Sequence, residues 1–195
     1  MKKLTVALLL FTLSALTSWA GDFQKGMSAY YSGDYTTALE ELAALAEQGD
    51  TDAQFILGSM HENGQGVPQD YKQAVKWYTK AAEQGMAEAQ YILGAMYEDG
   101  QGVPQDYKQA VKWYAKAAEQ GDADAQSNLG GMYANGQGVP QDNVSAHMWF
   151  NLAAVDEYED ASKNRDIIAK RMTTADISKA QSLARECLKK NYKGC

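Results

Sequence analysis

Basic residues are scarce over most of this 195-residue chain. Residues 21–162 contain 7 Lys and Arg against 22 Asp and Glu, whereas residues 163–195 contain 9 against 3. Because an acidic surface repels phosphate, we exclude nucleic acid as the main partner. The basic end could contact an anionic lipid or an acidic protein, or it could be no more than the solvated face of a helix.

Long apolar segments are absent after the first 20 residues. Lys2 and Lys3 precede an apolar run at 4–16, and Ser18-Trp19-Ala20 places small residues at the positions that a signal peptidase inspects. The run is short for a membrane span, which needs about 20 apolar residues. We therefore predict a signal peptide at residues 1–20 rather than an uncleaved anchor. The mature protein is expected in the periplasm or the secreted fraction, with no membrane span.

Proline is rare, and its positions reveal a repeat. Pro68, Pro104 and Pro140 follow one another at intervals of 36 residues. The segment at 64–85, GQGVPQDYKQAVKWYTKAAEQG, returns at 100–121 with one change, and its first seven residues return from position 136. A fixed period of this size is typical of a solenoid of stacked helix pairs.

Each regular repeat is expected to contain two helices. The first helices are predicted near 52–63, 88–99 and 124–135, and each carries Ala, Leu and Met on one buried face. A glycine in the middle of a helix costs about 1 kcal/mol relative to alanine. Its recurrence in all three helices indicates a close helix crossing at Gly58, Gly94 and Gly130.

The two ends of the solenoid differ from its middle. Residues 23–49 are predicted to form an irregular first helix pair. In the last repeat, Met148 and Leu152 replace lysines of the earlier repeats, so this face must be covered. We expect two closing helices, at 164–172 and 174–190, to cover it. The second of them has an apolar stripe of Ile177, Ala180, Ala184, Cys187 and Leu188.

The repeated motif A-x-A-Q-x-x-L-G-x-M-Y-x-x-G-x-G-V-x-x-D-x-x-x-A-x-x-W-Y-x-x-A-A resembles the Sel-one-like repeat (SLR) family, which is related to the tetratricopeptide repeats. It occupies residues 52–85, 88–121 and 124–154, with His61 standing where the other two repeats have tyrosine. The resemblance implies an all-α, right-handed solenoid of antiparallel helix pairs with a C-terminal helical cap. The expected organisation is a signal peptide at 1–20, an irregular repeat at 21–50, three regular repeats at 51–158 and capping helices at 159–195.

The resemblance also implies the function of an adaptor or scaffold in signalling, envelope processes or host contact. We therefore predict a non-catalytic protein of the bacterial envelope or secreted fraction that binds a protein or peptide. The alternative is an envelope hydrolase, or a protein that interacts with peptidoglycan or β-lactams, with a site that no motif reveals.

Residues that could support catalysis are few. The two histidines, His61 and His147, occupy different repeat positions, so a shared metal site is not expected and each is interpreted as a packing residue. Some cysteine-rich secreted members of the family have been linked to penicillin binding and β-lactam hydrolysis. This chain lacks both the S-x-x-K and K-T-G motifs and the paired cysteines within each repeat. We predict no enzyme activity, no cofactor and no metal.

The chain has only two cysteines, and both follow the last repeat. An oxidising compartment favours a Cys187–Cys195 disulfide, and Gly194 gives the tail freedom to fold back. Cys187 also lies on the apolar stripe of the last helix. A buried Cys187 thiol with a free or intermolecular Cys195 therefore fits the sequence nearly as well.

Positions that vary while the framework repeats are the candidate binding residues. Their spacing of four and then three residues puts them on one stripe of the first helices, which lines the concave groove in tetratricopeptide-like stacks. Sequence drift at positions with no packing role would produce the same variation. The predicted binding residues are Phe55, Ser59, Glu62, Tyr91, Ala95, Glu98, Ser127 and Gly131, and Ala134 completes the last column.

The predicted signal peptide is tested by the mass of the exported protein. We expect the mature chain to begin at Gly21, because cleavage follows the small residues Ser18 and Ala20. Intact-mass spectrometry of the periplasmic or secreted protein measures this directly. A mass that still includes residues 1–20 would contradict the prediction.

Overall fold

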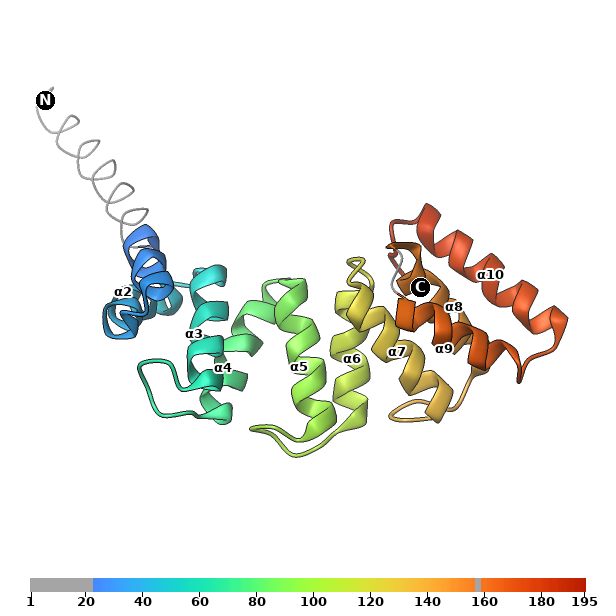
Figure 1. Ribbon diagram of the computed structural model, residues 1–195, viewed down its shortest axis with the longest axis horizontal. Coiled ribbons are helices and arrows are strands. Elements are labelled where there is room, and N and C mark those ends of the chain that lie inside the picture. Colours follow the sequence, from blue (N-terminus) through green and yellow to red (C-terminus); the bar gives the residue numbers. More distant parts are fainter. Residues whose placement is uncertain (1–22, 157–158) are drawn as a thin grey trace, which may run out of the picture. The chain divides into compact units, whose positions relative to one another are not determined.

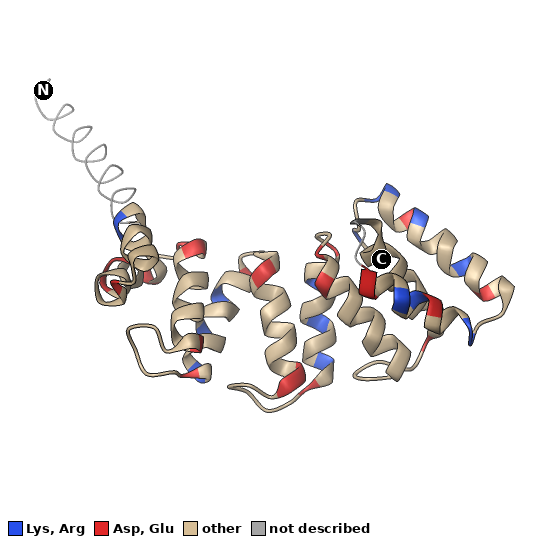
Figure 2. Cartoon of the chain, viewed as in Figure 1, with Lys and Arg blue, Asp and Glu red and all other residues tan. Residues whose placement is uncertain are grey.

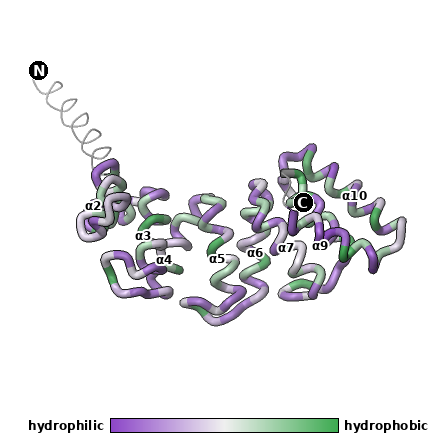
Figure 3. The backbone as a smooth tube through the Cα atoms, in the orientation of Figure 1, coloured by the Kyte–Doolittle hydropathy of each residue, from purple (hydrophilic) through white to green (hydrophobic). Residues whose placement is uncertain are grey.

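The computed structural model describes residues 23–156 and 159–195, and all regular secondary structure in these ranges is helical (Figure 1). The predicted signal peptide at 1–20 lies outside the described residues. The chain divides into two compact units, residues 1–81 and 82–195. Hydrophobic and hydrophilic residues intersperse along the helices of both units (Figure 3). None of the described helices is long and apolar enough to cross a membrane.

The first unit begins with the expected irregular helix pair. Residues 23–32 are helical and are followed by α2 (Tyr35–Glu47). The first regular repeat consists of α3 (Thr51–Asn63) and α4 (Tyr71–Glu83). Apolar residues of α2 and α3 form one core cluster, in which the buried members include Ala38, Leu42, Leu45, Ala53, Leu57 and Met60.

The second unit contains the other two repeats and the C-terminal cap. Its repeats are α5 (Ala87–Asp99) with α6 (Tyr107–Ala118), and α7 (Ala123–Asn135) with α8 (Asn143–Ala153). A short 3-10 helix, η1 (Ala154–Asp156), follows α8. The chain continues with α9 (Glu159–Ala169) and α10 (Thr174–Lys189). The first helices of the three regular repeats, α3, α5 and α7, begin and end within one residue of the predicted bounds.

The loop inside each repeat satisfies the backbone groups that the helix ends leave free. After α5, Gly100 adopts a left-handed conformation with φ 73° and donates its N–H to Met96 O. Gln105 Nε2 donates to Glu98 O at 2.7 Å. The Asp106 carboxylate then accepts the Lys108 and Gln109 amides as the N-cap of α6. Gln69 and Gln141 make the equivalent contacts with Glu62 O and Ala134 O.

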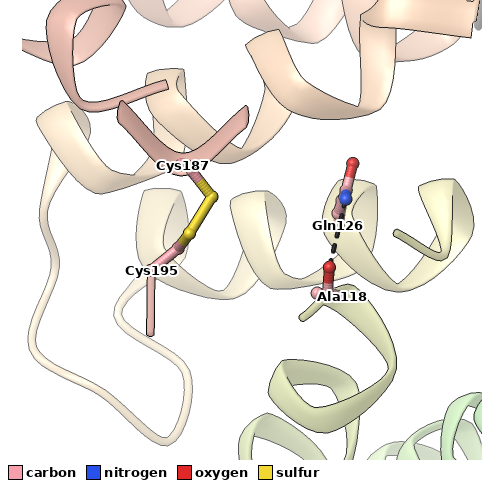
Figure 4. The surroundings of a disulfide bond; sticks show 4 residues. All are labelled: Ala118, Gln126, Cys187 and Cys195. Carbon is pink, nitrogen blue, oxygen red and sulfur yellow. Dashed lines mark hydrogen bonds between the residues drawn. A yellow bond between two sulfur atoms is a disulfide. The ribbon is translucent and has the colours of Figure 1, made fainter. Parts of the chain in front are cut away.

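A buried glutamine connects each repeat to the helix before it. Gln54, Gln90 and Gln126 donate Nε2 to Ala46 O at 3.0 Å, Ala82 O at 2.9 Å and Ala118 O at 3.1 Å. Figure 4 shows the last of these bonds. Each acceptor lies in the last turn of a helix, where carbonyls have no partner within the helix. These amides therefore join consecutive repeats.

The mid-helix glycines lie against an aromatic ring of the next helix, as the sequence predicts. A Cβ atom on Gly58 would lie 2.7 Å from the Tyr78 ring, and one on Gly94 would lie 2.4 Å from the Tyr114 ring. The same atom on Gly130 would lie 2.9 Å from the Phe150 ring. No side chain fits at these positions without displacing the ring.

Helix α10 covers the apolar face of the last repeat. Lys80 and Lys116 lie over the rings of Trp77 and Trp113, at 3.9 and 4.3 Å from the ring centroids. In the third repeat, Leu152 takes the place of these lysines and is buried. Met148 and Leu152 pack in one cluster with Ala180, Ala184 and Cys187 of α10. This confirms the expected cover for α10. Ile168 of α9 packs instead with Phe150 and Ala134.

The two closing helices differ in detail from their predicted form. Helix α9 begins five residues earlier than expected, because Glu159 and Asp160 favour a helix N-terminus and both pair with Lys163. A Thr173–Asp176 capping box begins α10. Leu188 is 37% exposed, so its assignment to the apolar stripe is wrong. It lies about 100° around the helix from the inward-facing Cys187.

The C-terminal tail folds back onto α10. Tyr192 N donates to Cys187 O at 2.9 Å, and a disulfide joins Cys187 to Cys195 with their Cα atoms 5.5 Å apart (Figure 4). Gly194 has φ 70°, the left-handed conformation that the return of the chain requires. The Tyr192 ring lies against Gly121 at the end of α6.

Two adjacent glycines of α7 provide a test of the close helix crossing. Gly130→Ala should lower the free energy of unfolding by about 1–2 kcal/mol, because the added methyl meets the Phe150 ring. Gly131→Ala should raise it by about 0.5–1 kcal/mol, because nothing lies within 4 Å of its new Cβ and alanine favours the helix. Urea unfolding followed by circular dichroism measures both. Equal effects of the two substitutions would contradict the crossing.

Candidate functional site

The predicted binding residues share one face of each first helix. Each of them is half-buried, so each combines contact with the protein and access to solvent. They lie on α3 in the first unit and on α5 and α7 in the second. By helix they are Phe55, Ser59 and Glu62 on α3, Tyr91, Ala95 and Glu98 on α5, and Ser127 and Gly131 on α7.

In the first unit, the stripe is arranged around the buried Tyr78 of α4. The Phe55 and Tyr78 rings pack with centroids 5.6 Å apart and planes inclined by 55°. Tyr78 Oη donates to Glu62 Oε2 at 2.6 Å, and the Ser59 side chain lies near the same hydroxyl. The structure therefore brings all three predicted residues of α3 together around one ring.

In the second unit, Tyr114 of α6 has the same role. Its ring packs against Tyr91 with centroids 5.9 Å apart, and its hydroxyl donates to Glu98 Oε2 at 2.7 Å. Asn128 of α7 lies near the hydroxyls of both tyrosines and lowers the pKa of each, against the larger effect of burial. Ala95 packs against the core of this unit. The result is a half-exposed patch of Tyr91, Glu98 and Asn128 around the buried Tyr114 ring.

The third repeat replaces this polar arrangement with apolar groups. Ala134 stands where the earlier repeats have Glu62 and Glu98, and Phe150 stands where they have Tyr78 and Tyr114. Both residues are buried in one apolar cluster. Gly131 and Ala134 lie beside Phe150 in a pocket, while Ser127 lies one turn earlier on the same helix.

Three segments of the chain, residues 51–86, 87–122 and 123–154, match the model of the Sel1 repeat, and together they make up more than half of its length. The chain belongs to the Sel1 repeat family. This confirms the predicted family and the all-α repeat solenoid. Sel1 repeat proteins generally act as protein-interaction scaffolds, and the family is typically non-catalytic. No curated protein matches the chain.

Solved structures similar to this chain are themselves Sel1 repeat proteins or have the same fold. The Sel1 repeat protein from Oxalobacter formigenes is 40% identical, with a TM-score of 0.61 over 66% of this chain and 97% of that one. A protective antigen present in uropathogenic Escherichia coli strains is 30% identical, with a TM-score of 0.54 over 94% of this chain. The match covers 49% of the antigen, so this chain spans about half its length. Helicobacter pylori cysteine rich protein B is 26% identical, with a TM-score of 0.52 over 67% of this chain and 93% of that one.

Tyr78 and Tyr114 were not among the predicted binding residues, so the sequence analysis missed their polar role in the Sel1 repeats. A signal for this role was present, because positions 16 residues apart change together. The first two repeats pair Glu62 with Tyr78 and Glu98 with Tyr114, and the third loses both polar groups at once. The contribution of Asn128 has no counterpart in the repeat pattern, since no equivalent position carries an asparagine.

Burial keeps the central tyrosines of the Sel1 repeats neutral. Desolvation raises the pKa of Tyr78 and of Tyr114 far above the usual value for tyrosine, and the neighbouring glutamate raises each pKa further. Desolvation also raises the pKa of Tyr91. Each of the two buried hydroxyls is therefore a permanent donor that holds its glutamate in place. Neither is an ionised nucleophile or base at neutral pH.

The two histidines lie in separate units. His147 is 3% exposed on α8, and His61 is half-buried on α3. Burial is the main cause that lowers the pKa of each, so both are neutral at neutral pH. Among the described residues, no group of three or more His, Cys, Asp or Glu side chains could hold a metal ion.

A double-mutant cycle tests whether Glu98 and Tyr114 act as a pair. Glu98→Ala and Tyr114→Phe should each lower the free energy of unfolding by about 1–2 kcal/mol, because each leaves a polar partner unsatisfied. The double variant has the residues that the third repeat carries at these positions, Ala134 and Phe150. Its loss of unfolding free energy should be about 1 kcal/mol smaller than the sum of the two single losses. Urea unfolding gives these values, and a Glu88→Ala with Tyr114→Phe cycle is the control. Additive losses in the first cycle would show that the hydrogen bond contributes nothing.

Proposed function

We propose that this protein is a non-catalytic scaffold of the bacterial envelope or secreted fraction, and that it binds a protein or peptide segment through the stripe of its first helices. Sel1 repeat proteins generally mediate protein–protein interactions, which supports this class of function. The observation that carries the proposal is the repeated aromatic–carboxylate patch around Tyr78 and Tyr114.

Each of the two units has groups suited to bind part of a partner segment. Phe55 and Tyr91 are half-exposed aromatic side chains held by ring packing, and aromatic anchors often dominate binding energy at interfaces. Glu62 and Glu98 are each held at one oxygen by a tyrosine hydroxyl. Because these carboxylates are already positioned, a basic side chain binds them with little further ordering. A segment with apolar and basic residues fits this chemistry.

The charge distribution supports the same class of partner. Acidic residues outnumber basic ones three to one between residues 21 and 162. Such an excess attracts a basic segment before contact and speeds its association. Sequence drift would account for the variation of the stripe. Drift alone does not explain why the variable positions surround one buried tyrosine in each of the two units.

The compartment is proposed from the two ends of the chain. The N-terminal 20 residues have the charged start, apolar run and small residues of a signal peptide. At the other end, the Cys187–Cys195 disulfide is of the kind that persists in the periplasm or outside the cell. Both features support export from the cytoplasm.

Selection of peptides by the purified protein tests the proposed stripe. Displayed libraries of random 12-residue peptides should yield sequences that combine aromatic or aliphatic residues with Lys or Arg. A synthetic peptide of the selected sequence should bind the Phe55→Ala, Tyr91→Ala double variant at least 10-fold more weakly than the wild type, by fluorescence anisotropy. Each ring supplies apolar contact area that alanine removes.

The control for this experiment is Tyr31→Ala, which removes an aromatic ring that is 79% exposed and outside the stripe. It should leave the affinity unchanged. Circular dichroism must show the same helicity in all three proteins. Wild-type affinity in a folded double variant would place the binding site away from the stripe.

A further inference from the structure

The third repeat contains a pocket at positions where the earlier two repeats carry larger side chains. It has a volume of about 240 Å³ and lies among α7, α8 and α9 of the second unit. Gly131 and Ala134 of α7 open it, because they are smaller than the serine or alanine and the glutamate at the equivalent positions of the other repeats. The Phe150 ring forms another wall, without the hydroxyl that Tyr78 and Tyr114 carry.

Helix α9 completes the apolar part of the pocket. Ile168 is buried, whereas Ile167 is 48% exposed although it is a large apolar side chain. The pocket is smaller than the roughly 300–1,000 Å³ of typical small-molecule and cofactor sites. Its size and apolar walls fit one large apolar side chain.

The remaining lining residues are polar and exposed. They are Asn135 of α7, Asn164 of α9 and Arg171, which follows α9. Arg171 is held near the pocket by the turn in which its N–H donates to Ile168 O at 2.9 Å. Within residues 23–156 and 159–195, its guanidinium forms no ion pair or side-chain hydrogen bond. A cation without a side-chain partner among the described residues thus lies beside an apolar pocket.

The charge of this end of the chain adds to the effect of Arg171. Residues 163–195 contain 9 basic and 3 acidic side chains, and Lys and Arg lie along α9 and α10 (Figure 2). This end therefore attracts an anion, in contrast to the acidic repeats. Arginine binds a carboxylate through two parallel hydrogen bonds, which makes it well suited to a fixed carboxylate.

We propose that this pocket binds the C-terminal residue of a partner protein. A large apolar side chain, such as phenylalanine or leucine, enters between Phe150 and Ile168, and the terminal carboxylate binds Arg171 with the Asn164 amide as a second donor. One C-terminal residue supplies both groups, which suits a pocket of this size. The proposal deepens the proposed scaffold function, since it assumes a protein partner. It uses the third-repeat part of the stripe, at Gly131 and Ala134, and not Phe55 or Tyr91.

The test uses the purified full protein and short synthetic peptides with an N-terminal fluorescein, followed by fluorescence anisotropy. The first probe, Gly-Ser-Gly-Ser-Phe, ends in a free carboxylate. The second is the same peptide as the C-terminal amide, and the third ends in Gly instead of Phe. We expect the amide and the Gly peptide each to bind at least 10-fold more weakly than the first probe.

Variants of the protein separate the two halves of the site. Gly131→Leu should abolish binding, because nothing lies within 4 Å of the new Cβ and the side chain can enter the pocket without straining the helix. Arg171→Gln should lower the affinity for the free-acid peptide at least 10-fold and leave the affinity for the amide peptide unchanged. Arg171→Lys should retain part of the affinity for the free-acid peptide. The matched control is Arg185→Gln on α10, which should bind like the wild type.

Several outcomes would overturn the proposal. Equal binding of the acid and the amide would exclude carboxylate recognition, and full binding by a folded Gly131→Leu variant would exclude the pocket. An amidated peptide with an internal Phe-Glu that binds as tightly as the first probe would exclude a chain terminus. Self-association of the protein that Gly131→Leu abolishes would make the pocket an interface between copies. The Phe55→Ala, Tyr91→Ala variant should bind the first probe normally, so this test and that of the stripe fail independently.

Discussion

The contact between an aromatic ring and a glycine backbone is the constraint on which the rest of the structure depends. Tyr78, Tyr114 and Phe150 each lie where a side chain on the facing glycine would overlap the ring. Each glycine weakens its own helix by about 1 kcal/mol. In return, a large ring is buried at the crossing of the two helices. The hydroxyls of Tyr78 and Tyr114 then reach the glutamate one turn further along the first helix.

Because the framework satisfies its own backbone, the stripe is free to vary. The Gln54, Gln90 and Gln126 amides bind the last-turn carbonyls of the preceding helices. The glutamines of the loops and the aspartate N-caps satisfy most of the remaining helix ends. The glutamine contacts recur in all three regular repeats, and their side chains lie outside the stripe, of which they use only backbone carbonyls. A change from Phe55 to Tyr91 to Ser127 can therefore alter the surface without weakening the fold.

The third repeat shows how the same framework takes on different chemistry. Loss of the glutamate–tyrosine pair leaves an apolar pocket wall beside α9, and replacement of two lysines leaves an apolar face under α10. The acidic and aromatic patch of the second repeat and the basic surroundings of the pocket thus belong to one unit. Two surfaces of opposite charge on one scaffold can recognise different segments of a partner.

The sequence by itself was sufficient to predict the repeats, their helices and their family. The 36-residue period, the glycines and the capping residues are local or periodic signals, and each depends on residues close together in the chain. The cover over Met148 and Leu152 could also be predicted, since an apolar face must be buried. The start of α9 and the exposure of Leu188 were wrong in the sequence-based expectation, because helix ends and the flank of a stripe depend on what packs against them.

Only the tertiary structure decided which stripe residues act together. It placed Phe55, Ser59 and Glu62 around Tyr78, and it brought Asn128 of one repeat to Tyr91 and Tyr114 of the repeat before it. It also placed Arg171 beside Gly131 and Phe150, although these residues belong to three different segments. Periodicity assigns a residue to a face of its own helix. Which side chains from other helices meet that face depends on how the helices pack, and no spacing within the sequence encodes this directly.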